Sequence, residues 1–263
     1  MSKAILMVSF GTSYESTREK TIGKMGEAFR QAFPDRTLYQ AYTSERILAI
    51  IKKRDGILID TIEEALLRMI RDGVTDLLVQ PTHILNGIEN DSMKEIVNGY
   101  KEAFQEIRLG APLLNSSRDY SQVIDAIAET FTEYNLGRED AVVLMGHGTE
   151  HYSNAAYGAL DYVLKEKGLD SVYVATVEAY PTIEEAIGLM RQKNYKKVLL
   201  LPFMIVAGEH ANKDMVGPGE ESFRSVLKKE GYEVEYRLRG LGEYEKIREL
   251  FIQHANNSRP LSQ

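Results

Sequence analysis

The chain has 263 residues, 43% of them hydrophobic, which is typical of a globular protein with one large domain or two ordinary ones. It contains no cysteine, which excludes disulfides, thiolate metal sites and cysteine nucleophiles, so any metal ion must be bound by His, Asp or Glu. The formal net charge of -7 at pH 7 argues against a nucleic-acid partner.

The sequence also argues against a membrane protein. No apolar run reaches the roughly 18 residues that a membrane helix requires. A strand-like run begins at Ala4, without a cationic leader and cleavage site before it. We therefore expect a cytoplasmic protein that does not contact a membrane.

Short runs rich in β-branched residues alternate along the chain with longer segments of helical period. This alternation is typical of parallel strands joined by crossover helices, and it predicts an α/β fold with helices on both faces of the sheets. The predicted strands begin near Ala4, Leu38, Thr75, Ile107, Ala141, Val172, Lys197 and Glu233.

An internal repeat indicates two similar lobes. The segment Thr61–Ala65 recurs as Thr182–Ala186 at an offset of 121 residues, and both copies have the Thr-x-x-Glu pattern of a capping box. The offset changes nearer the N-terminus because the first half carries extra residues around 52–56. We expect an N-terminal α/β lobe of residues 1–116 and a C-terminal lobe of residues 117–263, each with a mainly parallel sheet. The same offset pairs Met69 with Met190, Pro81 with Pro202, Ile84 with Ile205 and Gly87 with Gly208.

Three polar side chains follow predicted strands of the second lobe. Ligands of open parallel sheets bind at the carboxyl ends of the strands, so His147, Glu178 and His210 should converge, beside a cleft between the lobes. Two imidazoles and a carboxylate suit a first-row divalent ion. At this point an alternative stays open: His147 is a turn residue between Gly146 and Gly148, and the other two are ordinary loop residues.

Candidate residues of the first lobe are fewer. Glu89 aligns with His210 at the offset of 121, so a carboxylate and an imidazole should face each other and could handle protons or pass a metal ion. Alternatively, Glu89 only begins a helix, where the helix dipole favours an acid. His83 aligns with Met204 in an apolar stretch, which favours a histidine in a pocket wall over a metal ligand.

Motifs of nucleotide enzymes and serine hydrolases are absent. The turn at Gly11-Thr12-Ser13 lacks the spacing of a phosphate loop, and the first strand is not followed by Gly-x-Gly-x-x-Gly. No Gly-x-Ser-x-Gly elbow occurs. The strand-end residues therefore remain the best candidates for chemistry.

The sequence resembles the anaerobic cobaltochelatases of cobalamin synthesis, within the class II chelatases that include ferrochelatase. The resemblance covers almost the whole chain. It is carried by Val8-Ser9-Phe10-Gly11-Thr12-Ser13-Tyr14, Met145-Gly146-His147-Gly148, Val177-Glu178-Ala179-Tyr180-Pro181 and the segment from Val206 to Met215.

The resemblance implies a bilobal, ATP-independent enzyme that inserts Co²⁺ into sirohydrochlorin or precorrin-2, with the tetrapyrrole held between the lobes. It places metal ligands at His147, Glu178 and His210, a proton acceptor at His147 and a catalytic carboxylate at Glu89. The loop after Gly87 has fewer acids than the resemblance leads us to expect, so Asp91 stays open as an alternative to Glu89. The divalent ion is a substrate, and no organic cofactor is expected.

Further residues are expected to hold the macrocycle. The backbone amides of Gly11 to Ser13, with Arg46 and Lys213, should bind its carboxylates. His151 is expected beside the metal centre and His254 on the surface. The macrocycle contacts are expected at Ser9, Phe10, Gly11, Thr12, Ser13, Tyr14, His83 and Met204.

Three rival interpretations stay open at this point. The first is the same reaction with nickel or iron, because two His and one Glu suit several ions. The second is a carrier of metal or tetrapyrrole without catalysis, and the third is a two-lobed periplasmic solute-binding protein. Homo-oligomerisation is not readable from the sequence.

Overall fold

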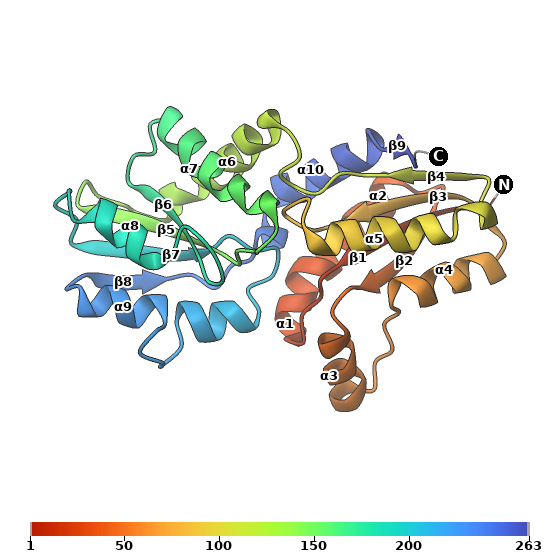
Figure 1. Ribbon diagram of the computed structural model, residues 1–263, viewed down its shortest axis with the longest axis horizontal. Helices are drawn as coiled ribbons and strands as arrows, with labels where there is room; N and C mark the ends of the chain where they lie inside the picture. Colours follow the sequence, from red (N-terminus) through yellow and green to blue (C-terminus); the bar gives the residue numbers. More distant parts are fainter. Residues whose placement is uncertain (1, 262–263) are drawn as a thin grey trace. The chain divides into compact units, whose positions relative to one another are not determined.

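Two mainly parallel sheets organise the chain, as the alternation of strand-like and helical segments predicts. The computed structural model describes residues 2–261, and the chain divides into two units (Figure 1). The first unit comprises Met1–Asn115 and Glu245–Gln263, and the second comprises Ser116–Tyr244. Each unit has its own sheet and its own hydrophobic core, which confirms the α/β fold class with two similar lobes.

The sheet of the first unit has the order β2-β1-β3-β4-β9, in which the first four strands are parallel and β9 is antiparallel to β4. The sheet of the second unit has the order β6-β5-β7-β8 and is parallel throughout. Apart from β9, the two orders are the same. The strands are β1 Ser2–Ser9, β2 Thr37–Tyr42, β3 Val74–Pro81, β4 Glu106–Leu109, β5 Asp140–Gly146, β6 Val172–Thr176, β7 Lys197–Pro202, β8 Glu233–Tyr236 and β9 Arg259–Pro260.

Helices connect the parallel strands and cover both faces of the sheets (Figure 1). Short 3-10 or π-helical turns flank several of them. None of the helices described is both long enough and apolar enough to span a membrane. The helices are α1 Glu15–Arg18, α2 Lys24–Ala32, α3 Glu45–Asp55, α4 Ile62–Arg71, α5 Ile88–Gly99, α6 Ser117–Phe131, α7 Ala155–Glu166, α8 Ile183–Met190, α9 Phe223–Lys229 and α10 Glu245–Asn256.

Strand β1 shows why each sheet is covered on both faces. Its residues from Ala4 to Val8 are all buried, as in a strand that is packed on two sides. Successive side chains of a strand point to opposite faces. Ala4, Leu6 and Val8 pack in one core with α4 and α5, and the residues between them point to the opposite face. Because both faces of the sheet are buried, the strand sequences are continuous apolar runs and do not alternate between apolar and polar residues.

The repeated capping boxes form as predicted. In α4, the Thr61 hydroxyl accepts a hydrogen bond from the Glu64 amide, and the Glu64 carboxylate accepts one from the Thr61 amide at 2.8 Å. In α8, the Glu185 carboxylate likewise accepts a hydrogen bond from the Thr182 amide at 2.8 Å. Each box satisfies amide groups that have no partner inside the helix.

The last residues of the chain belong to the first unit, whereas the sequence led us to expect residues 117–263 in one C-terminal lobe. Strand β9 pairs with β4, and the Arg108 side chain donates a hydrogen bond to the Ser258 hydroxyl at 3.1 Å. Helix α10 contacts α2 and β3, because its buried side chains, among them Ile247 and Phe251, cover the face of the first sheet opposite α4 and α5. The second unit therefore ends at Tyr244.

Helix α3 is the insertion that shifts the repeat offset in the first half. It begins at the N-cap Ser44, whose hydroxyl accepts a hydrogen bond from the Ile47 amide, and it ends at Gly56 in the left-handed conformation. In the second unit, β6 leads directly to α8 without a helix between them. The Arg54 guanidinium of α3 donates to the Ser13 carbonyl at 2.5 Å, so the insertion supports the loop after β1.

We predict that Phe251→Ala destabilises the first unit by about 3–5 kcal/mol, because the ring is fully buried between α10 and the sheet and its loss leaves a cavity. Urea unfolding followed by circular dichroism measures the change. Glu249→Ala, at an exposed position of the same helix, is the control and should stay within about 0.5 kcal/mol of the wild type. Equal stability of the two variants would contradict the packing of α10 on this sheet.

Candidate metal centre

His147 begins the loop that follows β5. A Cβ atom at Gly146 would lie 2.3 Å from the Tyr157 ring, so only glycine lets α7 pack this closely against the strand end. Gly148 has a φ of +82°, which turns the chain directly after the histidine. The His147 Nδ1 lies 2.8 Å from the Gly148 carbonyl, which requires a donor there. Nδ1 therefore carries the proton, and Nε2 keeps its lone pair for an ion.

Glu178 lies two residues beyond the end of β6, and the backbone joins it directly to the His147 loop. The Glu178 amide donates to the His147 carbonyl at 2.9 Å. The Thr176 hydroxyl donates to the Ala179 carbonyl at 2.6 Å, which holds the two sides of the loop around Glu178 together. The distance between His147 and Glu178 is thus set by main-chain hydrogen bonds between neighbouring strand ends.

A side chain from the start of α7 joins the same two loops. The Asn154 amide group donates to the Tyr180 carbonyl at 2.6 Å, and its carbonyl oxygen accepts from the Thr149 amide at 3.1 Å. Thr149 belongs to the loop after β5, and Tyr180 belongs to the loop after β6. Asn154 therefore reinforces the arrangement of His147 and Glu178.

His210 lies in the loop region after β7, directly before a π-helical turn, Ala211–Met215. The Asn212 amide donates to the Gly208 carbonyl at 3.1 Å, and the Asn212 side chain donates to the same oxygen at 2.8 Å. The His210 Nδ1 lies 2.7 Å from the Asp214 carboxylate. As at His147, Nδ1 is engaged and Nε2 is left to bind an ion.

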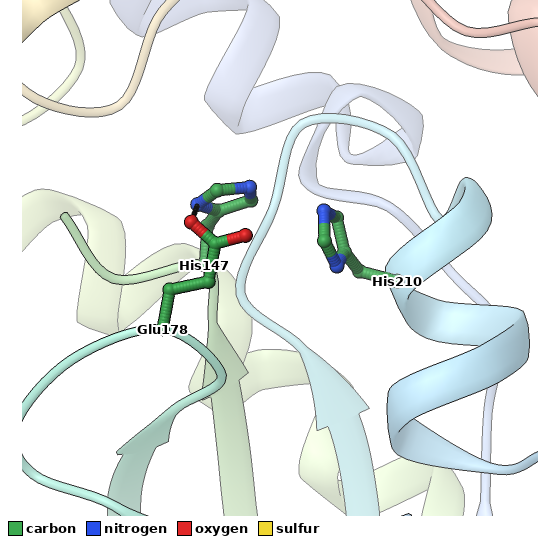
Figure 2. A group of neighbouring side chains, drawn as sticks. All are labelled: His147, Glu178 and His210. Carbon is green, nitrogen blue, oxygen red and sulfur yellow. Dashed lines mark ion pairs between the residues drawn. The ribbon is translucent and has the colours of Figure 1, made fainter.

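The structure brings these three side chains together (Figure 2). Each offers one ligand atom, and these atoms lie within 4.8 Å of one another. The two imidazole rings are 4.5 Å apart between centroids and nearly perpendicular, and the His147 Nδ1 lies 3.5 Å from a Glu178 carboxylate oxygen. The side chains of His147, Glu178 and His210 are 38%, 53% and 33% exposed, so an ion can reach them from solvent.

The geometry suits a small divalent ion. An ion bound at about 2.0–2.2 Å by nitrogen and oxygen ligands holds those ligand atoms roughly 3–4 Å apart. Small side-chain rotations would therefore close the present arrangement around an ion. Three protein ligands leave at least one coordination position for water or for a nitrogen of another molecule. Such an open site can receive an ion and also pass it on.

Comparison with known proteins identifies the family. The family model described as cobalt chelatase (CbiK) matches residues 3–259. The chain belongs to the cobalt chelatase family. It is 36% identical over 258 residues to the sirohydrochlorin cobaltochelatase of Salmonella typhimurium, covering 98% of this chain and 97% of that one. It is 31% identical over 260 residues to the sirohydrochlorin cobaltochelatase CbiKC of Nitratidesulfovibrio vulgaris, covering 96% and 89%.

A solved structure shares the fold of this family member. SirB from Bacillus subtilis, determined with Fe³⁺, superposes with a TM-score of 0.68 over 98% of this chain and 95% of that chain. The sequence identity is 16%, so the likeness concerns the fold alone. It confirms the chelatase-like architecture expected from the sequence.

In the first unit, the loop after β1 presents only part of the side chains expected to contact a ligand. Phe10 and Tyr14 are 43% and 40% exposed. Ser9 and Thr12 are buried, and the Ser9 hydroxyl accepts a hydrogen bond from Thr82 at 2.9 Å. Gly11 has a φ of +98° and contacts the Tyr42 ring, so it is required by the turn. Ser13 is half-buried, and its carbonyl is bound by Arg54.

The two candidate carboxylates of the first unit lie in the first turn of α5. Glu89 is exposed, whereas Asp91 pairs with Lys94 at 3.3 Å. Lys94 also donates to the Asn86 side chain at 2.6 Å, which holds it over the start of the helix. The environment of Asp91 is that of a structural ion pair, which favours Glu89 as the carboxylate available for chemistry.

His83 and Met204 occupy equivalent places after β3 and β7 but differ in their surroundings. Met204 packs in the hydrophobic core of the second unit. Both ring nitrogens of His83 are buried, and neither has a hydrogen-bond partner among residues 2–261. Burial lowers the pKa of the His83 imidazole to about 4, and the negative charge of Glu89 acts in the opposite direction. His83 is therefore neutral at physiological pH.

Most of the other predicted site residues form hydrogen bonds or ion pairs with neighbouring parts of the fold. Lys213 pairs with Glu209 at 3.1 Å, and Arg46 is exposed on α3. The His151 Nδ1 accepts a hydrogen bond from the Ser153 amide at 3.2 Å and so caps a short 3-10 turn. His254 was expected on the surface, but it is half-buried because α10 packs on the first sheet, where its Nδ1 lies 3.3 Å from the Ala111 carbonyl.

Sequence reasoning missed the side chains that support the metal centre. Asp214 lies four residues after His210, a spacing that places two residues on one face of a helix and could have been noticed. Asn154 carries no such signal, because it joins loops from two different strands. Arg54 lies in the insertion recognised from the repeat, but its contact with Ser13 cannot be inferred from spacing.

We predict that His83 makes stability depend on pH. The folded-state pKa of about 4 is below the usual value of about 6.5, so the unfolded chain takes up a proton first as the pH falls. The contribution of the neutral His83 side chain to the free energy of unfolding is therefore fully present above pH 6.5. It is lost as the pH falls toward 4, by at most about 1.4 kcal/mol per pH unit for one proton.

The variant His83→Met tests this, because the equivalent position of the second unit is Met204 and the side chain is compatible with the fold. Urea midpoints of both proteins are compared from pH 7 to pH 4.5. The wild type should lose more stability than the variant over this range. Parallel pH profiles would show that His83 is not held neutral by burial.

Proposed function

We propose that this protein is a sirohydrochlorin cobaltochelatase that inserts Co²⁺ into the macrocycle without ATP. Two pyrrole N–H protons are released for each ion inserted. The proposal is carried by one observation: His147, Glu178 and His210 offer ligand atoms within 4.8 Å of one another in a chain of the cobalt chelatase family. Two relatives with similarity over nearly the whole chain are sirohydrochlorin cobaltochelatases, which supports the choice of substrate and ion.

The three side chains would hold the ion before transfer. With Nδ1 of each ring facing an acceptor, the Nε2 atoms of His147 and His210 would be the metal-binding nitrogens, and the Glu178 carboxylate would supply one negative charge. Such a ligand set binds a first-row divalent ion while leaving positions open for incoming pyrrole nitrogens. Transfer then exchanges protein and water ligands for ring nitrogens, and no covalent bond to the protein is required.

Proton removal is the second task. A neutral imidazole can bind a metal ion or accept a proton, and both occur at neutral pH. We assign His147 as the acceptor for one pyrrole proton after it releases the ion. Glu89 is exposed in the first turn of α5 and is assigned to the other proton. Holding the ion and the ring together replaces an encounter in solution, which we expect to be the main source of acceleration.

Aromatic side chains near the strand ends would contact the flat ring. Phe10 and Tyr14 follow β1, and Tyr152 and Tyr180 belong to the loops that carry His147 and Glu178. These four side chains are between 40% and 79% exposed, so their rings are accessible to a flat ligand. For the carboxylate arms we retain the amides of residues 11–13 together with Arg46, which is exposed at the start of α3.

Nickel and iron remain candidate substrates for the same site. The ligand set of two imidazoles and one carboxylate binds several first-row ions, and the affinity order ranks nickel above cobalt. The site alone therefore predicts activity with more than one ion. A carrier of metal or tetrapyrrole is the second candidate, and it differs by binding both ligands without accelerating insertion.

The test follows the absorbance spectrum of sirohydrochlorin with Co²⁺, Ni²⁺ or Fe²⁺ in the presence of wild type, His147→Ala, His210→Ala or His254→Gln. The wild type should insert Co²⁺ well above the rate without protein. The first two variants should lose activity by about 100-fold or more, because each removes one of three ligands. His254→Gln, which changes an imidazole of the first unit outside the metal centre, should keep activity within about twofold.

Two results would contradict the proposal. If the macrocycle binds but insertion is no faster than without protein, the protein is a carrier. If His254→Gln loses as much activity as the other variants, the loss does not report on the metal centre. The ranking of the three ions by rate identifies the preferred metal.

A further inference from the structure

The two imidazoles of the metal centre are held in different ways. The His147 Nδ1 faces a main-chain carbonyl, that of Gly148, which no side-chain substitution removes. The His210 Nδ1 faces a side chain, the carboxylate of Asp214, at 2.7 Å. The short contact of the His147 Nδ1 is thus made to the backbone, with the Glu178 carboxylate farther away at 3.5 Å, whereas the short contact of the His210 Nδ1 is made to a side chain.

The chain around His210 is built to bring Asp214 back to the ring. His210 is the N-cap of the π-helical turn Ala211–Met215, and Asp214, four residues later, lies within this turn. The Gly217 amide closes the end of this turn by donating to the Lys213 carbonyl at 3.0 Å. A Cβ atom at Gly217 would lie 2.3 Å from that carbonyl oxygen, so the closure needs glycine. Single π-helical turns occur frequently at functional sites.

The contact decides which nitrogen of His210 is available. A carboxylate accepts hydrogen bonds, so the nitrogen that faces it must carry the proton. With the proton on Nδ1, the lone pair lies on Nε2. A ring without this partner would populate both tautomers and would rotate about its side-chain bonds, since 33% of its surface is exposed. A bond of 2.7 Å to a charged acceptor is in the range of strong hydrogen bonds.

We propose that Asp214 is a positioning residue of the metal centre, which fixes the tautomer and the direction of the His210 ring so that Nε2 meets the ion. The inference rests on the proposed function, because it assumes that His210 binds the transferred ion. Asp214 acts through His210 and is not itself a ligand: the group of side chains that can share one ion includes His147, Glu178 and His210 but not Asp214. Partners of this kind typically change metal affinity or activity by 10–100-fold when removed.

The test measures Co²⁺ binding first, with Co²⁺ alone as the probe and the full-length protein. Titration is followed by the visible absorption bands of protein-bound Co²⁺, which respond to ligand geometry. Asp214→Ala should weaken binding by about tenfold or more and should alter the bands. Asp214→Asn keeps an oxygen that accepts the Nδ1 proton, so it should stay within about threefold of the wild type.

A matched control separates this role from the general effect of local charge. Glu209 is the neighbouring carboxylate, and it forms an ion pair with Lys213 at 3.1 Å. Glu209→Gln should therefore bind Co²⁺ within about twofold of the wild type. In the insertion assay, Asp214→Ala should raise the KM for Co²⁺ and leave the KM for sirohydrochlorin unchanged. Circular dichroism and thermal unfolding check that the variants are folded.

The outcomes distinguish the inference from the proposed function. If wild type and His210→Ala bind Co²⁺ equally weakly, the metal centre itself is wrong. If His210→Ala loses binding but Asp214→Ala stays within about twofold of the wild type, the metal centre stands and the role of Asp214 is overturned. The role is also overturned if Asp214→Asn binds as weakly as Asp214→Ala, because a hydrogen-bond acceptor would then not be sufficient.

Discussion

The parallel pairing of β6, β5 and β7 is the constraint on which the metal centre depends. Strands that run in one direction end at the same edge of the sheet, so the residues that follow them become neighbours although they are far apart in the sequence. His147 and Glu178 are joined at this edge by a main-chain hydrogen bond of 2.9 Å. His210 reaches the same place from the turn after β7. The order of the strands thus assembles three ligands that no local motif contains.

The two units share one strand order, but different side chains follow the equivalent strands. The second unit places two imidazoles and a carboxylate after its strands. At the corresponding places, the first unit has the exposed ring of Phe10 after β1 and the carboxylate of Glu89 at the start of α5. The insertion α3 adds Arg54, which binds the loop after β1 through the Ser13 carbonyl. The same strand order thus places a group that could hold an ion at the strand ends of one unit, and an aromatic ring and a carboxylate at the equivalent places of the other.

The sequence predicted most of the fold because the relevant signals are local. The eight strands β1–β8 begin within two residues of their predicted starts, and both capping boxes form. The grouping of His147, Glu178 and His210 was predictable because each of these residues follows an apolar run. The packing of α10 on the first unit was not predictable, because its apolar face could cover the sheet of either unit. The pairing of β9 with β4, which follows α10, places the helix on the first sheet. The contacts of Asn154 and the burial of both His83 nitrogens depend on loop paths that spacing does not specify, whereas the spacing of His210 and Asp214 carried a signal.

The central claim is that one ion is bound jointly by His147, Glu178 and His210, and diffraction tests it most directly. Crystals soaked in Co²⁺ would be measured on both sides of the cobalt absorption edge. The account predicts an anomalous peak at about 2.0–2.2 Å from the Nε2 atoms of both histidines and from a Glu178 carboxylate oxygen. A peak coordinated through Nδ1, or a peak at another group of residues with none at this one, would contradict it.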